Sequence, residues 1–510
     1  MRSEPSKASK GDLATNVYDI APYRGAVSPL TSPSHLAICA KWNAGFSPPL
    51  AHLQVAELGC GDGANLLPLA FYNRSSNFIG FDNCQAALLE ARANAVRIGL
   101  ENVQFLYKDI RDVSPVWFGR YHYIIAHGLY SWVADDARSA ILGFCRNTLT
   151  LSGLAYISYN AQPGWATRRL VRETLLRSRL VNEASLECKA AKAIQVATQL
   201  LKDLPYPDCA ASVVLSEELQ RVCNGKPFYV LHEYLAEAND GFWLRDFVER
   251  ARQHDLDYVC DAQFCRWEGH VPSDLRACLA KRGLDIIEQE ETADLLCDRY
   301  FRASILYRQG PERTRMSHRE LLEQVHIASS LAAHSDPVEL RRAKRQTFLG
   351  TGGPEVILEE PITKAAIILM AARWPRGTTL GRIYLEAVEL LATHGISVPE
   401  TAHEQLSDDL ITLFEAGQID LRLSEPPFNS SVPERPQAHA LARFEAEHRD
   451  ALTSPYHLPI LFDIAALGLI RNLDGTRTRS QLHDAFGDDL VDQTLSICAR
   501  WGFLDPRAGG

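Results

Sequence analysis

Residues 55–65 read Val-Ala-Glu-Leu-Gly-Cys-Gly-Asp-Gly-Ala-Asn. In this stretch Glu57 stands two places before the first of three glycines at alternate positions, Gly59, Gly61 and Gly63. A short apolar run precedes the glycines, and a run compatible with a helix follows them. The order of strand, tight turn and helix is typical of the nucleotide-handling corner of a doubly wound α/β sheet.

The glycine pattern admits two kinds of ligand. Gly59, Gly61 and Ala64 satisfy the dinucleotide fingerprint G-x-G-x-x-[GA], in which glycines let a ligand approach the backbone. The carboxylate of Glu57, however, would repel a pyrophosphate and attract a cationic ligand, and Gly63 extends the pattern to Glu-x-Gly-x-Gly-x-Gly. Both features favour a cationic ligand over a nicotinamide or a flavin.

Two acidic residues follow at the ends of predicted strands. The apolar run 77–81 predicts a second strand ending in Asp82, where a carboxylate can accept hydrogen bonds from ribose hydroxyls. The alternative is that Asp82 caps the helix predicted over 85–98. A third apolar run, 103–107, leads into Asp109, for which a plain turn residue is the alternative to a ligand contact.

The pattern beyond residue 120 indicates a larger sheet with a helical interruption. Strands are predicted over 121–126 and 154–159, and their alternation with helices favours a mostly parallel sheet with right-handed crossovers. Residues 166–221 are nearly all helical in pattern, whereas 256–261 and 301–307 are again strand-like.

The pattern Glu-x-Gly-x-Gly-x-Gly resembles motif I of the class I S-adenosylmethionine (SAM) methyltransferases, and the two acidic residues downstream strengthen the resemblance, which implies SAM as the cofactor. The resemblance implies that Asp109 meets the adenine amino group, with Ile110 against the ring. It also implies a Rossmann-like, seven-stranded α/β sheet whose last two strands are 256–261 and 301–307, the final one antiparallel, with a helical domain inserted after the fifth strand. The residues implied in cofactor binding are Glu57, Gly59, Gly61, Gly63, Asn65, Asp82, Asn83, Asp109, Ile110 and His127.

Two longer segments resemble a more particular group. Residues 127–133 (His-Gly-Leu-Tyr-Ser-Trp-Val) and 158–165 (Ser-Tyr-Asn-Ala-Gln-Pro-Gly-Trp) are similar to signatures of bacterial methyltransferases with a methyltransferase regulatory domain, which include the rickettsial-type protein-lysine methyltransferases. The chain departs from that family at Leu30 and Ser32, where Gln-Thr-His-Pro is usual, and in 298–302, where an Arg-rich stretch is eroded. These departures bear on the acceptor more than on the cofactor. Other segments that fit the family are 18–23, 31–33, 228–235, 301–306, 374–375 and 473–477.

Candidate catalytic residues stand at the ends of the fourth and fifth predicted strands, where open α/β sheets bind ligands. They are Tyr130, Tyr159 and Asn160. Aromatic rings and carbonyl oxygens suit the surroundings of a reacting amine, and core packing is an equal alternative for these three. Packing is the favoured role of Trp132 and Trp165.

His127 has two candidate roles. Its ordinary pKa lies near neutrality, so that it is a candidate base, but we favour a wall of the methionine pocket. Tyr18 and Tyr23 are candidate lid residues, which rests on the family resemblance alone.

Composition excludes several classes of protein. The chain has 510 residues, a net charge of −10 and a pI of about 5.9, which gives no electrostatic argument for nucleic acid. The twelve cysteines form no Cys-x-x-Cys pair and no His-Glu-x-x-His motif occurs, so no metal is implied. Without an apolar run of membrane-spanning length or a signal peptide, we expect a soluble, cytoplasmic protein that avoids membranes.

The expected domains follow the shifts in pattern. Short helices over 364–416 and a strand-like run at 419–423 suggest a winged-helix-like module, for which an interaction or dimerisation role is favoured over DNA binding. A homodimer is therefore an open expectation. The expected boundaries are a disordered tail at 1–15, the SAM-binding core with an N-terminal lid at 16–165, a helical regulatory domain returning the last sheet strands at 166–308, a linker at 309–318, and a mostly helical, winged-helix-like domain at 319–510.

Three functions remain in view. The first is methyl transfer from SAM to a protein or peptide, most plausibly to a lysine side-chain nitrogen, because about two thirds of the chain lies outside the catalytic core. The second is methyl transfer to a small molecule or a peptide natural product. The third is a SAM-binding regulator without catalytic activity.

Overall fold

The computed structural model describes residues 25–113, 120–178, 185–206, 208–264, 271–310, 316–334, 338–342, 344–350, 355–428 and 430–505. The expected tail at 1–15 and the candidate lid residues Tyr18 and Tyr23 lie outside these ranges.

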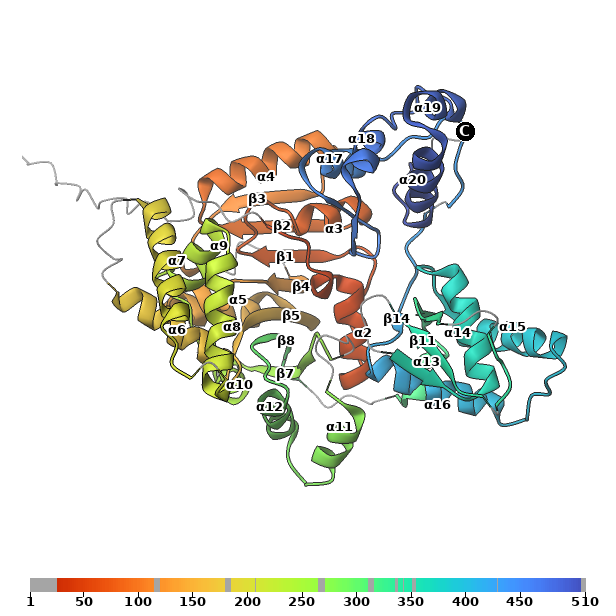
Figure 1. The fold of residues 1–510 in the computed structure, drawn as a ribbon, viewed down its shortest axis with the longest axis horizontal. Coiled ribbons are helices and arrows are strands. Elements are labelled where there is room, and N and C mark those ends of the chain that lie inside the picture. Colours follow the sequence, from red (N-terminus) through yellow and green to blue (C-terminus); the bar gives the residue numbers. More distant parts are fainter. Residues whose placement is uncertain are drawn as a thin grey trace, which may run out of the picture.

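A twisted central sheet organises the molecule (Figure 1). Its strand order is β3-β2-β1-β4-β5-β8-β7, with the short β6 paired to the end of β5. Strands β1 to β5 are parallel, whereas β8 runs antiparallel between β5 and β7. The predicted Rossmann-like sheet with an antiparallel last strand is confirmed. The strands are β1 Gln54–Leu58, β2 Asn77–Asp82, β3 Val103–Tyr107, β4 Tyr121–Ala126, β5 Leu149–Ala161, β6 Gly241–Phe242, β7 Leu256–Asp261 and β8 Phe301–Arg308.

Helices cover both faces of this sheet, because successive strand residues point to opposite sides. In β4, Tyr123 and Ile125 point into a first apolar cluster, on one face of the sheet. Ile124 and Ala126 point into a second apolar cluster, on the opposite face. The first face carries α2 Pro33–Ala44, α3 Leu66–Tyr72 and α4 Gln85–Ile98, and the second carries α5 Asp135–Thr148, α10 Leu244–Arg252 and α12 Ile286–Leu296. Single-turn helices lie at η1 Pro29–Thr31, η2 Ile110–Asp112 and η4 Tyr130–Trp132, and α11 Ser273–Ala280 precedes α12.

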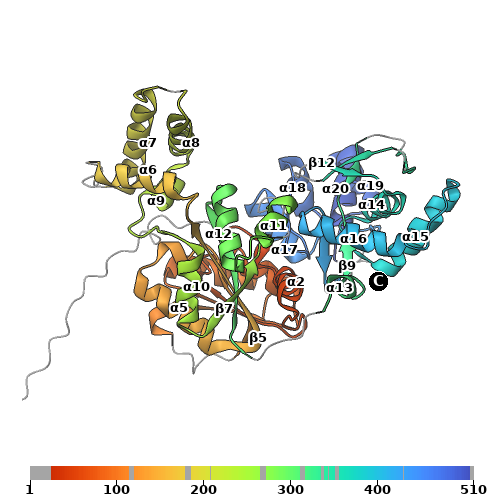
Figure 2. The ribbon, with the colours of Figure 1, turned by 90° about the horizontal axis from the view of Figure 1, so that it is seen from below.

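A helical insert leaves the sheet at the end of β5 and returns at β6. Its helices pack around their own buried cluster, which includes Val171, Leu219 and Tyr234. Arg168 joins them by ion pairs to Glu218 at 2.7 Å and to Glu233 at 2.8 Å. Figure 2 shows the insert standing off the rest of the molecule. Its helices are α6 Ala166–Arg177, α7 Leu186–Lys202, α8 Ala210–Asn224 and α9 Pro227–Tyr234.

The first C-terminal unit, residues 316–428, continues the core of the sheet. Trp42 of α2 stacks on His318 with ring centroids 3.8 Å apart and meets the edge of Phe414 at 4.6 Å. The short helices predicted over 364–416 are present, and the strand-like run 419–423 contains β14 (Asp420–Arg422). The other short strands, which belong to two small sheets, were not predicted from the sequence. The elements are α13 His318–Leu322, β9 His326–Ala328, β10 Ala332–Ala333, β11 Gln346–Leu349, β12 Glu355–Leu358, α14 Pro361–Arg373, β13 Thr378–Thr379, α15 Leu380–Thr393, α16 Ala402–Glu415 and β14 Asp420–Arg422.

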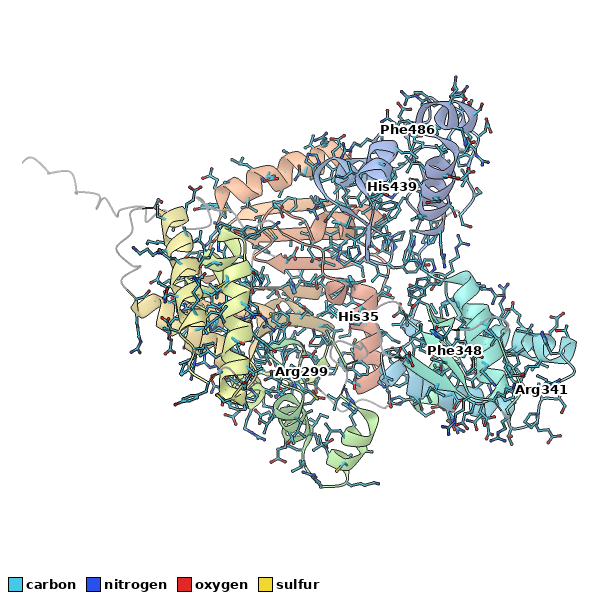
Figure 3. All side chains as sticks on the ribbon, viewed as in Figure 1. His35, Arg299, Arg341, Phe348, His439 and Phe486 are labelled. Carbon is cyan, nitrogen blue, oxygen red and sulfur yellow. The ribbon has the colours of Figure 1, made fainter. Side chains whose placement is uncertain are left out.

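The second C-terminal unit, residues 430–505, has its own apolar cluster. Phe348 and Phe486, labelled in Figure 3, mark the first and second units. A β-hairpin of the second unit lies against α3, where Tyr72 donates from Oη to the Thr453 carbonyl at 2.7 Å. The elements are α17 Ala440–His448, β15 Ala451–Thr453, β16 Pro459–Leu461, α18 Ile464–Arg471, α19 Arg479–Phe486 and α20 Asp488–Arg500.

Candidate active site

The three glycines after β1 all have positive φ angles, of 72°, 52° and 75° in chain order, so that each favours glycine. Their surroundings differ. A Cβ on Gly59 would lie 3.1 Å from Leu129 Cδ1, and one on Gly63 would lie 2.9 Å from Phe105 Cζ. A Cβ on Gly61 would meet no atom of the described residues within 4 Å. Gly59 and Gly63 therefore make room for protein side chains, and the backbone is open to a ligand at Gly61.

Asp82 ties this turn to the end of β2. Its Oδ2 accepts a hydrogen bond from Gly61 N at 2.8 Å, and its Oδ1 accepts one from Cys84 N at 2.8 Å, directly before α4. The carboxylate thus contacts the glycine turn and the start of the helix together. Asn83, the next residue, is exposed beside it.

Glu57 is buried beneath the turn, with 4% of its surface exposed. Asn65 donates from Nδ2 to Glu57 Oε1 at 2.8 Å, and no described residue bonds to the buried Oε2. Burial raises the pKa of Glu57 to about 8, since a carboxylate without solvent is unfavourable. The sequence suggested that Glu57 attracts a cation. The structure shows that Asn65, also a predicted site residue, holds the carboxyl group of Glu57 in its orientation.

Asp109 begins the short helix η2 and is engaged by its neighbour. Arg111 donates to Asp109 from its backbone N at 2.9 Å and from Nη2 at 2.6 Å, and these bonds hold the pKa of Asp109 below its usual range. Ile110 is half-buried against the second apolar cluster. The turn role considered from the sequence is present, and the predicted adenine contact stays a prediction.

His127, at the end of β4, lies against β5. Its Nδ1 is 2.9 Å from Tyr156 Oη and 3.3 Å from Ser158 Oγ. Burial lowers the pKa of His127 to about 4, so that the imidazole is neutral at physiological pH and a weak base. These features favour the wall role over the base.

Tyr130 and Tyr159 are fully buried in the second apolar cluster. Tyr159 stacks on Phe247 with ring centroids 4.3 Å apart, and its hydroxyl is 2.9 Å from Ser304 Oγ. Tyr130 meets the edge of Phe242 at 5.3 Å. Packing accounts for both side chains in this structure, and a catalytic role for them stays a prediction. Trp165 is likewise 1% exposed, whereas Trp132 is only partly buried.

Asn160 is anchored at the end of β5 by a chain of amides. Its Nδ2 donates to Asn239 Oδ1 at 2.6 Å, and Asn239 in turn donates from Nδ2 to the Glu233 carbonyl at 2.8 Å. Because the carbonyl of Glu233 can only accept, the group of Asn239 that faces it must be its NH2, and the group of Asn160 that faces the oxygen of Asn239 must also be its NH2. No described residue donates to Asn160 Oδ1, which is therefore available as an acceptor. Asn239 was not predicted, since it lies 79 residues further along the chain.

These residues fit a cationic nucleoside cofactor. The buried Glu57 Oε2 has no protein partner in the described ranges, and the space over Gly61 can be entered without moving a side chain. In the same ranges no group of His, Cys, Asp and Glu residues could hold a metal ion. Nor does any described helix have the length and apolar character needed to cross a membrane.

Three family descriptions match the chain. Residues 55–153 match a methyltransferase domain, 226–308 match the "Predicted methyltransferase regulatory domain", and 434–502 match the "PKMT, C-terminal winged helix domain". The last match covers the second C-terminal unit. The strand-like run 419–423, which suggested a winged helix from the sequence, instead contains β14 of the first unit.

Two similar proteins and one similar solved structure come from Rickettsia. The uncharacterized protein RP028 of Rickettsia prowazekii is 30% identical over 238 residues, which cover 46% of this chain and 94% of that protein. The uncharacterized protein RP789 of the same organism is 26% identical over 481 residues, which cover 92% of this chain and 85% of that protein. The structure of PKMT2 from Rickettsia typhi in complex with AdoHcy superposes with a TM-score of 0.82 at 23% identity, over 95% of this chain and all of that one.

The resemblance seen in the sequence is thereby confirmed. The sheet order, the glycine turn and the three matched domains occur in one chain, and most of the length of RP028 is covered. The chain is a class I SAM-dependent methyltransferase and belongs to the family that combines this sheet with a methyltransferase regulatory domain and a PKMT-type winged-helix domain.

Proposed function

We propose that the enzyme methylates a lysine side-chain nitrogen of a protein or peptide. The observation that carries this proposal is the amide of Asn160 at the end of β5: its Nδ2 is bonded to Asn239, and its oxygen accepts no hydrogen bond from a described residue. An amine carries the N–H donor that this oxygen needs. Support also comes from the names of the similar proteins, a PKMT winged-helix domain and PKMT2 of Rickettsia typhi.

The cofactor would be held by the turn after β1 and by the two strand ends beside it. Glu57 would face its positive charge, with Asn65 orienting the carboxyl group, and Asp82 would accept hydrogen bonds from the ribose. Gly61 gives the cofactor access to the backbone. The other residues of the proposed site are Gly59 and Gly63, which shape the turn, Asn83, Asp109 and Ile110 on the adenine side, and His127 as a wall.

Bound SAM supplies an electrophilic methyl group, and the work of the protein is to place an amine in line with it. The amine must first lose its proton, which a desolvated site beside a positive charge favours. His127 is a poor base for this step because burial keeps its pKa near 4. Asn160 Oδ1 would instead accept an N–H of the neutral amine and direct its lone pair.

The affinity for SAM is expected to rise with pH through the ionisation of Glu57. In the free enzyme the pKa of Glu57 is raised to about 8, so that at pH 7 the carboxyl is mostly protonated. Because a cation beside it favours the carboxylate, binding releases a proton, and affinity is lost as pH falls below 8. The Kd for SAM should be about tenfold lower at pH 9 than at pH 7.

Glu57→Gln is the matched control for that measurement. Glutamine at position 57 keeps an acceptor for Asn65 and cannot ionise. The amino group of SAM titrates in the same way with both enzymes, so the ratio of the Kd of the variant to the Kd of the wild type reports the ionisation of Glu57 alone. Calorimetric titrations from pH 6.5 to 9 give both values. A ratio that does not change with pH would contradict the role assigned to Glu57.

The acceptor is tested with methyl-labelled SAM. The purified full-length chain is incubated with a bacterial lysate separated into protein and low-mass fractions, with Gly61→Arg enzyme as the blank. Label in lysine of the protein fraction supports the proposal. Label in the low-mass fraction alone supports a small-molecule or peptide natural-product acceptor, and binding without transfer in either fraction supports a regulator.

A further inference from the structure

The tip of the winged-helix hairpin reaches the cofactor turn. His457 lies between β15 and β16 and is 2% exposed, and its Nε2 is 2.9 Å from Asn65 Oδ1, a residue 392 positions earlier in the chain. Asn65 stands directly before α3 and binds Glu57. A residue of the last domain is therefore one side chain away from the buried carboxyl of the cofactor site.

The direction of this hydrogen bond follows from its neighbours. Asn65 Oδ1 accepts from Ser28 N at 3.1 Å and lies 3.0 Å from the hydroxyl of Thr31, and Asn65 Nδ2 donates to Glu57, so the amide of Asn65 has one possible orientation. His457 must then donate from Nε2 to the same oxygen. Burial lowers the pKa of His457 to about 3, which keeps the ring neutral, and the amide oxygen of Asn65 selects the tautomer with its proton on Nε2.

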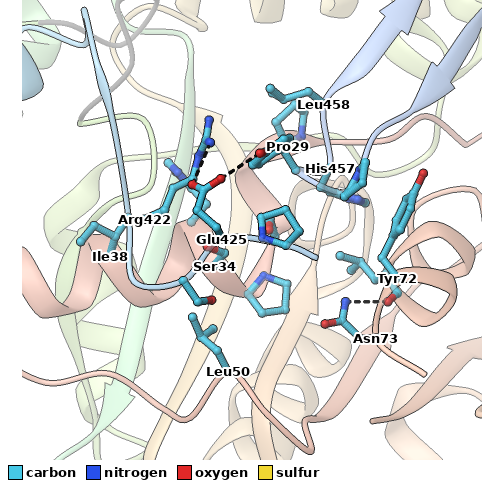
Figure 4. A pocket seen from close by; sticks show the side chains of 18 of the residues that line it. Pro29, Ser34, Ile38, Leu50, Tyr72, Asn73, Arg422, Glu425, His457 and Leu458 are labelled. Carbon is cyan, nitrogen blue, oxygen red and sulfur yellow. Dashed lines mark hydrogen bonds and ion pairs between the residues drawn. The ribbon is translucent and has the colours of Figure 1, made fainter. Parts of the chain in front are cut away.

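The hairpin is held at its base and at its tip. At the base, Tyr72 Oη donates to the Thr453 carbonyl and lies 3.0 Å from His439 Nε2. At the tip, Tyr456 donates from Oη to Glu425 Oε2 at 2.9 Å, and Glu425 is paired with Arg422 of β14. Figure 4 shows His457 beside Pro29 and Tyr72, with Arg422 and Glu425 across the adjoining cavity.

The backbone of His457 has an unfavourable conformation that the surrounding structure maintains. Its φ angle is 59°, in the left-handed region, which a non-glycine residue occupies at a cost of about 1 kcal/mol. Such residues persist where the surrounding structure fixes them, and they cluster at functional sites. Here the left-handed turn aims the imidazole at Asn65.

We infer that His457 is a positioning residue for the cofactor: by donating to Asn65 from the tip of the winged-helix hairpin, it helps to fix the amide that orients Glu57, so that full affinity for SAM requires this hydrogen bond. This inference rests on the proposed SAM site and adds to it a requirement for the C-terminal domain. It assigns that domain a part in cofactor binding, apart from any contact with the acceptor.

The test compares two substitutions at residue 457 in the full-length enzyme. Glutamine carries its Nε2 donor as many bonds from Cα as histidine does, whereas the amide of asparagine is one bond shorter and tolerates the left-handed backbone. His457→Asn should raise the Kd for SAM about tenfold, the loss expected for one buried hydrogen bond. His457→Gln should stay within about threefold of the wild type, and kcat at saturating SAM should be unchanged in both.

Tyr72→Phe is the control for the contacts at the base of the hairpin, because the tip stays bonded through Tyr456 and His457. It removes the bonds at the base of the hairpin and leaves Asn65 untouched, so its Kd for SAM should match the wild type. Equal losses in Tyr72→Phe and His457→Asn, or an unchanged Kd in His457→Asn, would overturn the inference. In a Glu57→Gln background, His457→Asn should have little further effect, which a general loss of stability would not produce. Wild-type enzyme that does not bind SAM would instead refute the proposed site.

Discussion

Gly61→Arg is expected to abolish SAM binding, raising the Kd by roughly 100-fold or more. The Cβ of residue 61 would point into the space beside the turn, where no atom of the described ranges lies within 4 Å. A guanidinium there would occupy the volume of the cofactor and repel its positive charge. Calorimetric titration of the purified variant with SAM measures this effect.

Gly99→Arg provides the matched control for that substitution. Gly99 ends α4 with a φ of 73°, and a Cβ there would also meet no neighbour within 4 Å in the part of the chain that the structure describes, so the backbone cost and the new charge are comparable. Its Kd for SAM should equal that of the wild type. Unchanged SAM affinity in Gly61→Arg would refute the placement of the cofactor.

Asn160→Leu is expected to lower kcat for a lysine-containing acceptor by roughly 100-fold while the Kd for SAM changes less than about twofold. Leucine has a similar size and lacks the acceptor oxygen that we propose for the amine. The Asn239 carbonyl oxygen also loses its donor, so thermal melting must accompany the kinetics. A variant that folds and retains full kcat would contradict the role of Asn160.

Asn160→Asp tests the same contact with the acceptor amine through the pH dependence of kcat. A carboxylate beside the acceptor amine favours the ammonium form, so the pH at which half of kcat is reached should shift upward. Activity lost at pH 7 should therefore return in part at pH 9. A profile that is lowered equally at every pH would indicate damage to the fold instead.

The sheet was predictable because its signals are local. The runs at 77–82, 103–107 and 121–126 are short, mostly apolar and bounded by polar residues, and the observed strands have the same limits. Helix α4 begins and ends as predicted, since Gly99 stops it in the left-handed conformation. Strands of two to four residues, such as those of 326–358, have too short a pattern to be recognised.

The site was predictable in part, for a physical reason. Neighbouring residues of a strand face opposite sides, so Tyr159 and Asn160 cannot play the same role, yet the sequence alone does not say which face is open. The structure places Tyr159 among Phe247 and its neighbours, and Asn160 against Asn239. Partners from distant segments, such as Asn239 and His457, have no local signature because folding alone brings them together.

The most direct test of the account is a calorimetric comparison of SAM with NAD on the wild-type enzyme. The turn after β1, with its buried Glu57 and open Gly61, should bind SAM at one site per chain and give no heat of binding with NAD. Binding of NAD together with no binding of SAM would contradict the account.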